Sequence, residues 1–265
     1  MNSSIKIDFL GVGSAFTTQE YHQPNLLITA KNGKRLLVDC GSDIRFSLGE
    51  WGKQRKVGIP AIDAVYCSHT HADHIGGLEW LAFDTYFNPQ AQKPVIYGVG
   101  DILKDIWERS LRGGVEFIDD KVMTLEDYFD PMVLDHTSPF VWEGVQFIPL
   151  KFLHVQNSVK PMYSYGLIIN SNADGDSFLF TTDTKFTEDL AKTLIDWEPR
   201  VKYIFQDTET TPYQTGVHAH YSELCTLPES IKNKMWLYHH NPNPKQKPLE
   251  DGFLGFVKKG QSFLT

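Results

Sequence analysis

The sequence predicts an α/β fold in which two mixed sheets face each other and helices cover the outer faces, an αββα four-layer sandwich. In each half of the chain strand-like runs come first and helical segments later. Hairpins are mixed with strand–helix units, so antiparallel and parallel pairing are both expected. The 265 residues, 41% of them hydrophobic, are enough to bury a large core.

The first half of the chain carries clear turn and capping signals. Residues 5–9 alternate as a strand does, and Asn32-Gly33 between two apolar runs is a strong hairpin signal. Ser42-Asp43 can cap a short helix. Residues 113–139 are acidic and rich in aromatics, and we expect an irregular surface excursion there. Strands are expected at 5–9, 26–30, 36–39, 63–68 and 95–97, and helices at 74–83 and 101–111.

The second half repeats this order of strands before helices. Strands are expected at 145–149, 163–169, 177–182, 201–205 and 235–238, and helices at 186–197 and 220–227. Residues 172–176 have the composition of a tight turn. Pro242, Pro244 and Pro248 are expected to break regular structure.

Composition argues against several classes of protein. The formal net charge is −8, whereas a protein that grips long nucleic acid is usually basic. The three cysteines, Cys40, Cys67 and Cys225, are too few for a disulfide framework, which favours a reducing cytoplasmic setting. The first residues do not resemble a signal peptide, and no apolar run approaches the ~18 residues typical of a membrane span.

Three histidines and an aspartate lie within six residues of the segment Cys67-Ser68-His69-Thr70-His71-Ala72-Asp73-His74. Residues two apart on an extended loop point the same way, so His69 and His71 can bind one metal ion. Asp73 and His74 lie where the loop turns into a helix and can bind a second. Imidazole and carboxylate ligands suit zinc, with manganese, iron or nickel as alternatives. The alternative interpretation is a solvent-exposed, histidine-rich loop that binds no metal.

The segment resembles the His-x-His-x-Asp-His motif of the metallo-β-lactamase fold, and the resemblance extends over almost the whole chain. It implies two divalent metal ions, Zn²⁺ or alternatively Mn²⁺. It also implies that Asp39, in an Asp-x-Gly element, orients a ligand. His240 competes with His239 for the last ligand position. The implied ligands are His69, His71 and His154 for the first metal, Asp73, His74 and His239 for the second, and Asp183 as a bridge.

Within this fold, the glycine-rich segment Phe9–Ala15 resembles the start of the ribonuclease Z branch of phosphodiesterases. In that branch an acidic residue at a strand end partners a histidine that protonates the leaving oxygen. Asp207 and His218 occupy the matching places here, with His220 as a competing choice. The catalytic set is therefore expected to be Asp73, His218 and Asp207. A helix-capping loop with incidental histidines is the alternative interpretation.

The whole sequence is most similar to the anti-Pycsar phosphodiesterases, with which phage and bacteria destroy cyclic mononucleotide signals. This implies hydrolysis of 3′,5′-cyclic mononucleotides, cCMP and cUMP foremost and cAMP and cGMP as further candidates, to nucleoside monophosphates by a metal-activated hydroxide. It also implies a homodimer in which loops of one subunit close the other's site. We expect no stable nucleic-acid complex, no membrane association, and action in the cytoplasm, that of the host if a phage encodes the chain.

Other functions on this fold are a ribonuclease Z-like RNA endonuclease, an acyl hydrolase (lactonase or thioesterase) and a non-catalytic ligand sensor. Only 29 residues separate His154 from Asp183, too few for a tRNA-binding arm, and all seven ligand positions are intact. Because the ligands draw on both halves, we expect one domain over residues 1–265. Aromatic residues in expected loops could stack on bases: Phe83, Tyr86, Phe87, Tyr163, Tyr165 and Tyr213.

Overall fold

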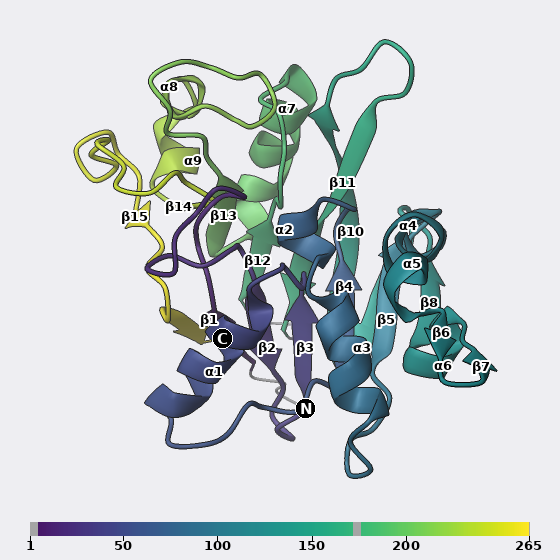
Figure 1. Cartoon of the computed structure of the whole chain (residues 1–265). Coiled ribbons are helices and arrows are strands. Elements are labelled where there is room, and N and C mark those ends of the chain that lie inside the picture. Colours follow the sequence, from purple (N-terminus) through teal and green to yellow (C-terminus); the bar gives the residue numbers. More distant parts are fainter. Residues whose placement is uncertain (1–4, 172–175, 265) are drawn as a thin grey trace.

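The strands of the chain form two mixed sheets that pack face to face (Figure 1). The computed structural model describes residues 5–171 and 176–264, so the predicted turn at 172–176 lies outside the described residues apart from Asp176. In the first sheet the strand order is β16-β1-β2-β3-β4-β5-β8. Its strands are β1 (Lys6–Phe9), β2 (Leu26–Thr29), β3 (Arg35–Val38), β4 (Ala64–Cys67), β5 (Val95–Val99), β8 (Asp130–Leu134) and β16 (Ser262–Leu264).

The second sheet has the order β15-β14-β13-β12-β11-β10-β9. In both sheets the hairpin-connected strands pair antiparallel, whereas strands joined through helices pair parallel. The strands of the second sheet are β9 (Phe140–Trp142), β10 (Val145–Val155), β11 (Met162–Asn170), β12 (Ser177–Phe180), β13 (Tyr203–Asp207), β14 (Met235–Tyr238) and β15 (Gly255–Phe256). A separate small hairpin pairs β6 (Phe117–Ile118) with β7 (Lys121–Val122).

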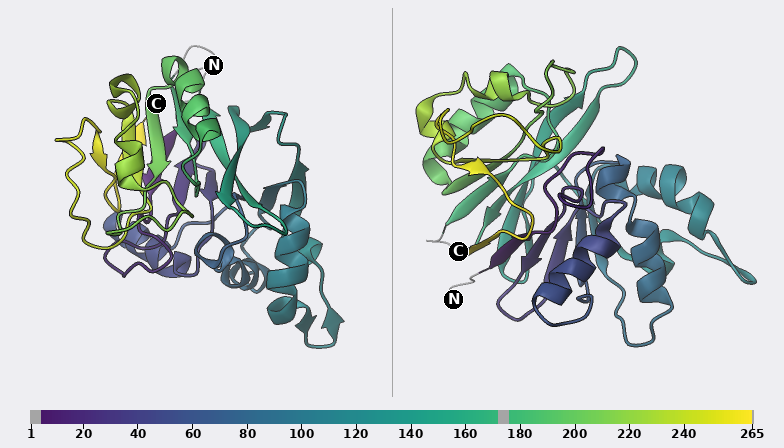
Figure 2. Two further views of the ribbon diagram at one scale, coloured as in Figure 1. Left: turned by 90° about the horizontal axis from the view of Figure 1, so that it is seen from above. Right: turned by 60° about the vertical axis from the view of Figure 1, so that its left-hand side comes forward.

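Alternating apolar side chains give the molecule its layers, because successive side chains of a strand point to opposite faces. Leu26 and Ile28 of β2 pack with Phe178 and Phe205 between the two sheets. Leu27 of the same strand lies in the layer between the first sheet and its helices. A third apolar layer lies between the second sheet and the helices that cover it. Figure 2 shows the helices of both sheets on the two outer sides of the paired sheets.

The first sheet is covered by α1 and α3, and the second by α7, α8 and α9. No helix in the described part of the chain combines the length and the apolar character needed to cross a bilayer. The helices are α1 (Ile44–Gln54), α2 (Ala72–Ile75), α3 (Leu78–Tyr86), α4 (Ile102–Ile106), α5 (Arg112–Val115), α6 (Leu125–Tyr128), α7 (Glu188–Trp197), α8 (Tyr221–Leu224) and α9 (Glu229–Lys232), with a π-helical turn at Trp107–Leu111 and a 3₁₀ turn at Glu198–Arg200.

The helix predicted at 74–83 is in fact two helices, α2 and α3, separated by Gly76-Gly77. The break has a packing cause. A Cβ on Gly77 would lie 2.3 Å from the carbonyl oxygen of Gly41, so only glycine allows these loops to pack so closely. The short α2 is thereby held against the loop that follows β3, and it presents Asp73 and His74 at its own start.

The prediction of an irregular excursion at 113–139 is wrong in part. Residues 130–134 form β8, which pairs parallel with β5 as an edge strand of the first sheet. Pro131 fits an edge strand, where one side of the backbone needs no partner. Pro131 and the acidic residues on either side concealed this strand, although Met132, Val133 and Leu134 are apolar. The rest of the excursion, with α6 and the β6–β7 hairpin, projects from the side of the molecule (Figure 1).

Several element boundaries also differ from the predictions. The helix after Ser42 has 11 residues rather than being short, and β10 has 11 residues instead of the predicted five. Strand β13 begins two residues later than predicted, and α8 ends at Leu224 rather than at 227. The prolines after His240 precede two unpredicted strands, β15 and β16, and β16 returns to pair with β1.

Candidate metal centre

The predicted ligands come from loops at the ends of strands in both sheets. His69 and His71 follow β4, Asp183 follows β12, and His239 follows β14, while His154 lies near the end of β10. Since the two sheets face each other, these ends meet at one edge of the sandwich. The structure thus brings together side chains that are far apart in the sequence.

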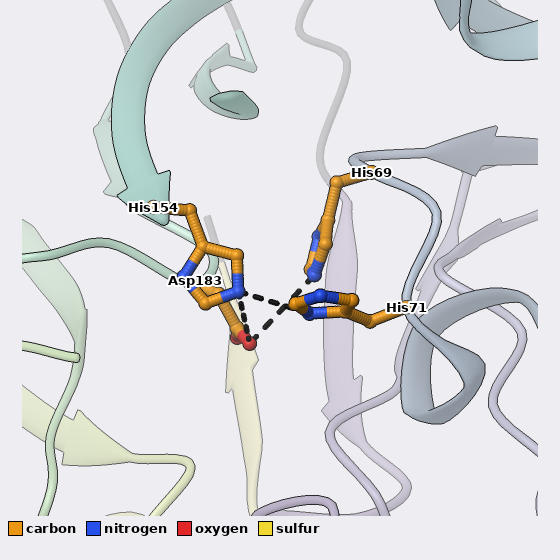
Figure 3. A group of neighbouring side chains, drawn as sticks. All are labelled: His69, His71, His154 and Asp183. Atoms are coloured by element: carbon orange, nitrogen blue, oxygen red, sulfur yellow. Dashed lines mark hydrogen bonds and ion pairs between the residues drawn. The ribbon is translucent and has the colours of Figure 1, made fainter. Parts of the chain in front are cut away.

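The first group consists of His69, His71, His154 and Asp183, whose ligand atoms all lie within 4.8 Å of one another. The Nε2 atoms of His69 and His154 lie 3.8 and 3.6 Å from Oδ2 of Asp183. Nδ1 of His71 lies 3.0 Å from Nε2 of His154. Figure 3 shows the three imidazoles converging on the carboxylate.

The second group consists of Asp73, His74, Asp183 and His239. Oδ1 of Asp183 lies 3.1 Å from Nε2 of His74 and 3.3 Å from Nε2 of His239. Oδ2 of Asp73 lies 3.3 Å from the same His239 atom. Asp183 therefore belongs to both groups and turns a different oxygen to each, which is the arrangement of a bridging ligand.

His240 is placed outside both groups. Its ring packs against Tyr21 and Phe256, with ring centroids 5.4 and 4.7 Å away, and its Nδ1 donates to the carbonyl of Asn241 at 2.9 Å. Of the two neighbouring histidines, the structure thus directs His239 to the cluster. The positive φ of His239, 61°, turns the backbone at this point.

Asp39 orients ligands of both groups, as the resemblance implied for one. Its Oδ2 accepts a hydrogen bond from Nδ1 of His74 at 2.7 Å. The same oxygen accepts from Oγ of Ser68, which in turn lies 3.0 Å from Nδ1 of His69. With their Nδ1 atoms engaged, both imidazoles turn Nε2 toward Asp183.

The carboxylates give the centre a negative potential. Burial opposes the charged form of His239, but the neighbouring Asp183 and Asp207 raise its pKa to about 10. Burial likewise opposes protonation of His74, whose pKa is nonetheless raised by Asp183 and Asp73. In the first group burial dominates and lowers the pKa of His154 to about 4. The imidazole of His154 in the first group is neutral, and the carboxylates of the second group attract positive charge. Both features favour the binding of a metal cation over the binding of protons.

The donor atoms fit divalent metal ions. Nε2 of His69, Nε2 of His74 and Oδ1 of Asp183 are buried and have no hydrogen-bond partner among the described residues, although two of them lie 3.1 Å apart. Buried polar atoms are normally hydrogen-bonded, so three unpaired atoms that face one another call for another partner. Imidazole and carboxylate donors bind divalent transition metals. The residues of the cluster therefore fit a divalent metal ion.

Asp207 and His218 form the predicted pair beside the cluster. Oδ2 of Asp207 accepts from Nδ1 of His218 at 2.9 Å and from the backbone of Thr184 at 2.9 Å, and its Oδ1 lies 3.2 Å from Nδ1 of His239. The His218 ring stacks on His239 at 4.8 Å. Burial lowers and Asp207 raises the pKa of His218, and the net shift is upward.

His220, the competing choice, has both ring nitrogens engaged away from the centre. Nδ1 contacts Oγ of Ser222 at 2.8 Å, and Nε2 contacts the carbonyl of Thr211 at 2.9 Å. His220 also caps the start of α8. The alternative interpretation of a helix-capping loop therefore applies to His220. His218, in contrast, faces the cluster.

A cavity of about 440 Å³ opens beside His218 and His239. The glycine-rich start of the chain contributes Ser14 and Phe16 to its wall, and the loop after β13 contributes Glu209 and Tyr213. Tyr213 was predicted as a base-stacking residue, whereas Glu209 was not predicted, and its only signal in the sequence is its position two residues after Asp207. A larger cavity of about 930 Å³ is lined by His240 and by none of the seven clustered residues.

The other aromatic residues considered for base stacking lie elsewhere. Phe83 and Tyr86 pack on Tyr128, with ring centroids 6.1 and 5.4 Å apart, and Phe87 packs on Phe83. Neither they nor Tyr163 and Tyr165 line the cavity beside His218.

Comparisons with known proteins identify relatives that carry the same family description. The family model of anti-Pycsar protein Apyc1 matches residues 5–263. The chain is 34% identical over 254 residues to the anti-Pycsar protein Apyc1 of Paenibacillus harenae, covering 95% of this chain and 96% of that protein. It is 29% identical over 276 residues to the Apyc1 protein of Bacillus phage vB_BveM-Goe7, with both chains fully covered.

Among solved structures, the metallo-β-lactamase fold protein YhfI from Bacillus subtilis superposes with a TM-score of 0.74 at 18% identity, covering 99% of this chain and 100% of that chain. This likeness confirms the predicted fold class.

Proposed function

The chain belongs to the anti-Pycsar Apyc1 protein family, and we propose that it uses two metal ions to hydrolyse 3′,5′-cyclic mononucleotides to nucleoside monophosphates. It is a metal-dependent hydrolase of the phosphodiesterase class. The substrate, the number of metal ions and their identity belong to the proposal. We propose Zn²⁺, with Mn²⁺ as the alternative, and cCMP and cUMP as the first substrates to test.

The observation that carries the proposal is the position of Asp183 between the two ligand groups. One carboxylate with an oxygen toward each group is suited to hold two cations close together. Two bound cations polarise a phosphoryl group and lower the pKa of a water molecule. His69, His71 and His154 would hold one cation and Asp73, His74 and His239 the other.

The chain's own residues supply the proton for the leaving group. Nδ1 of His218 donates to Asp207, which leaves Nε2 to carry a proton toward the ribose oxygen that departs. The buried Asp207 stabilises the protonated imidazole and fixes its orientation. The contact of Asp207 with His239 ties this proton donor to the metal ligands.

A small substrate is favoured over RNA by what lies between His154 and Asp183. The described residues in this interval belong mainly to the β10–β11 hairpin and β12, with no separate arm. Together with the net charge of −8, this supports a small anionic substrate that bound cations, rather than a basic surface, would hold.

We also propose that the protein is a homodimer that acts in the cytoplasm, as the resemblance implies. The segment after β5 carries exposed apolar side chains, since Phe117 and Val122 are 71% and 68% exposed. Such exposure supports a subunit interface at this face. Light scattering on the purified protein would give the mass of a dimer. A monomeric mass at micromolar concentration would overturn the dimer without affecting the proposed reaction.

A substrate panel tests the function directly. Cyclic mononucleotides, cyclic dinucleotides, a tRNA precursor, a lactone and a thioester are incubated with metal-loaded protein of measured metal content. We expect rapid turnover of cCMP and cUMP that a chelator abolishes. Survival of all cyclic mononucleotides, or faster turnover of the precursor RNA or the acyl substrates, would refute the proposal.

A further inference from the structure

Glu209 is held at a defined place in the wall of the cavity beside His218. It lies two residues after Asp207 at the end of β13, and it is only 6% exposed. Its backbone N–H donates to the carbonyl of Ala219 at 2.9 Å, and its carbonyl accepts from the N–H of Tyr221 at 2.9 Å. Both bonds join Glu209 to the segment that carries His218.

One oxygen of this carboxylate is free to accept a hydrogen bond. Oε2 accepts from the backbone N–H of Thr215 at 3.0 Å. Within the described residues Oε1 has no hydrogen-bond partner, and no cationic side chain pairs with Glu209. A largely buried carboxylate without a cation costs free energy unless its oxygens find donors. Oε1 is not fully buried, so water in the cavity can donate to it, and a ligand hydroxyl can take the place of that water.

The rest of the wall suits a nucleoside. Phe16 and Tyr213 line the cavity with rings that are 89% and 68% exposed, and such rings stack on bases. Oγ of Ser14 is buried there without a partner. The volume of about 440 Å³ is within the range of small-molecule sites.

We propose that Glu209 determines sugar specificity by accepting a hydrogen bond from the ribose 2′-hydroxyl, so that the enzyme favours cyclic ribonucleotides over their 2′-deoxy counterparts. This inference rests on the proposed function. In a 3′,5′-cyclic nucleotide the 2′-hydroxyl is the sugar's one free hydroxyl, and it lies next to the carbon that bears the phosphate ester. With the phosphate at the metal ligands, the sugar is the part that first reaches the cavity wall. Carboxylates read the same hydroxyl in dinucleotide-binding folds.

The test compares cCMP with 2′-deoxy-cCMP in the wild type, in Glu209→Gln and in the matched control Glu188→Gln, an exposed glutamate of α7. The wild type and the control should prefer cCMP by about 10- to 100-fold in kcat/KM, the range for a hydrogen bond to a charged group. Glu209→Gln removes the charge but keeps a neutral acceptor oxygen, so it should cut this preference to about threefold or less, and Glu209→Leu, which cannot accept a hydrogen bond, should abolish it. The loss caused by Glu209→Gln should be larger on cCMP than on bis-p-nitrophenyl phosphate, which has no sugar.

Other outcomes would overturn the proposal. Equal losses on cCMP and 2′-deoxy-cCMP would give Glu209 a merely structural role through Thr215. A change in preference between cCMP and cUMP at an unchanged ribose-to-deoxyribose ratio would mean that it reads the base. A wild-type ratio near one would overturn the proposal even if the variant does not fold. If the wild type hydrolyses bis-p-nitrophenyl phosphate but neither cyclic nucleotide, the proposed function fails, and this inference fails with it.

Discussion

Asp183 and Asp207 divide the chemistry of the centre between two carboxylates. Asp183 turns one oxygen to each ligand group, and Asp207 contacts both His218 and the ligand His239. Both carboxylates are buried, and their neighbouring histidines lower the pKa of each despite that burial. The proposed metal site and the proposed proton donor are thus built from adjoining residues.

The role of His218 predicts a dependence on the leaving group. His218→Asn should lower kcat for cCMP by about 100- to 10,000-fold, the usual contribution of a general acid. The loss on bis-p-nitrophenyl phosphate should be much smaller, because nitrophenolate leaves without a proton. Steady-state kinetics on both substrates measure the difference. His220→Asn, which keeps a side chain able to cap α8 and removes no proton donor of the proposed reaction, is the control. Equal losses on the two substrates would contradict the assignment.

The placement of the two adjacent histidines gives a second paired prediction. His239→Asn should bind less metal and lose at least about 100-fold in activity, because Nε2 of His239 faces both Asp73 and Asp183. His240→Asn should retain full metal content, since its ring packs on Tyr21 and Phe256. Metal analysis of both dialysed variants provides the comparison, and the reverse order would exchange their roles.

Local sequence predicted part of this site and not the rest. The spacing of His69, His71, Asp73 and His74 is visible in the sequence because these residues share one loop. Their partners His154, Asp183 and His239 carry no local signal, and only the resemblance pointed to them. Glu209 was missed because its importance arises from the cavity, which forms when the loop after β13 folds over the strand ends.

At the scale of elements, the contact between the β3–α1 loop and α2 positions half of the second ligand group. Gly77→Ala would force apart the backbone at Gly41, since its Cβ would lie 2.3 Å from that carbonyl oxygen. We expect a loss of about 1–3 kcal/mol in the free energy of unfolding and about 10- to 100-fold weaker metal binding.

The matched control is Gly49→Ala in α1, where an added Cβ meets nothing within 4 Å. Alanine is the better helix former, so this variant should be neutral or slightly more stable. Urea unfolding and metal titration of both variants give the comparison. Unchanged metal affinity in Gly77→Ala would mean that the close packing of α2 does not position its ligands.

The segment before β2 is tied to α1 by a buried histidine, which predicts a pH dependence of stability. His22 contacts Asp43 at 2.9 Å and Glu50 at 3.2 Å. Burial lowers and the two carboxylates raise its pKa, with a net upward shift. A raised folded pKa stabilises the protein fully below the unfolded value of about 6.5, and this contribution is lost as pH rises through the folded pKa.

His22→Asn tests this account, because asparagine tolerates the positive φ of 53° at this position. The variant should be less stable than the wild type by about 1 kcal/mol at pH 6, a modest value because the Glu50 side chain is 35% exposed. The difference should shrink at pH 9. Urea unfolding at the two pH values measures it, and a difference that grows with pH would contradict the sign.

Helices and strands were predicted correctly where their own sequence carries the signal. The hairpin at Asn32-Gly33 and the buried strands were predicted because alternation and turn residues are local. Strand β8 was missed because Pro131 and the neighbouring acidic residues favour a loop, although the strand ends in three apolar residues. The strands β15 and β16 were missed because they are short and their partners, β14 and β1, are determined by the tertiary fold.

At the scale of the whole molecule, the two facing sheets explain how an acidic chain can act on an anionic substrate. Strand ends from both sheets bring the seven proposed metal ligands to one edge of the sandwich. The net charge of −8 is compatible with this chemistry, because bound cations and His218 would face the phosphate. The layered fold was predictable from element order, whereas the cavity beside the cluster was not.

A metal titration of activity tests the central claim most directly. Chelator-stripped protein is titrated with Zn²⁺ while bound metal and cCMP hydrolysis are measured on the same samples. The account predicts two equivalents per chain, with activity rising as the second one binds. Asp183→Ala should lower activity by at least about 1,000-fold, several kcal/mol of transition-state stabilisation. Full activity at one equivalent, or undiminished activity in Asp183→Ala or without metal, would contradict it.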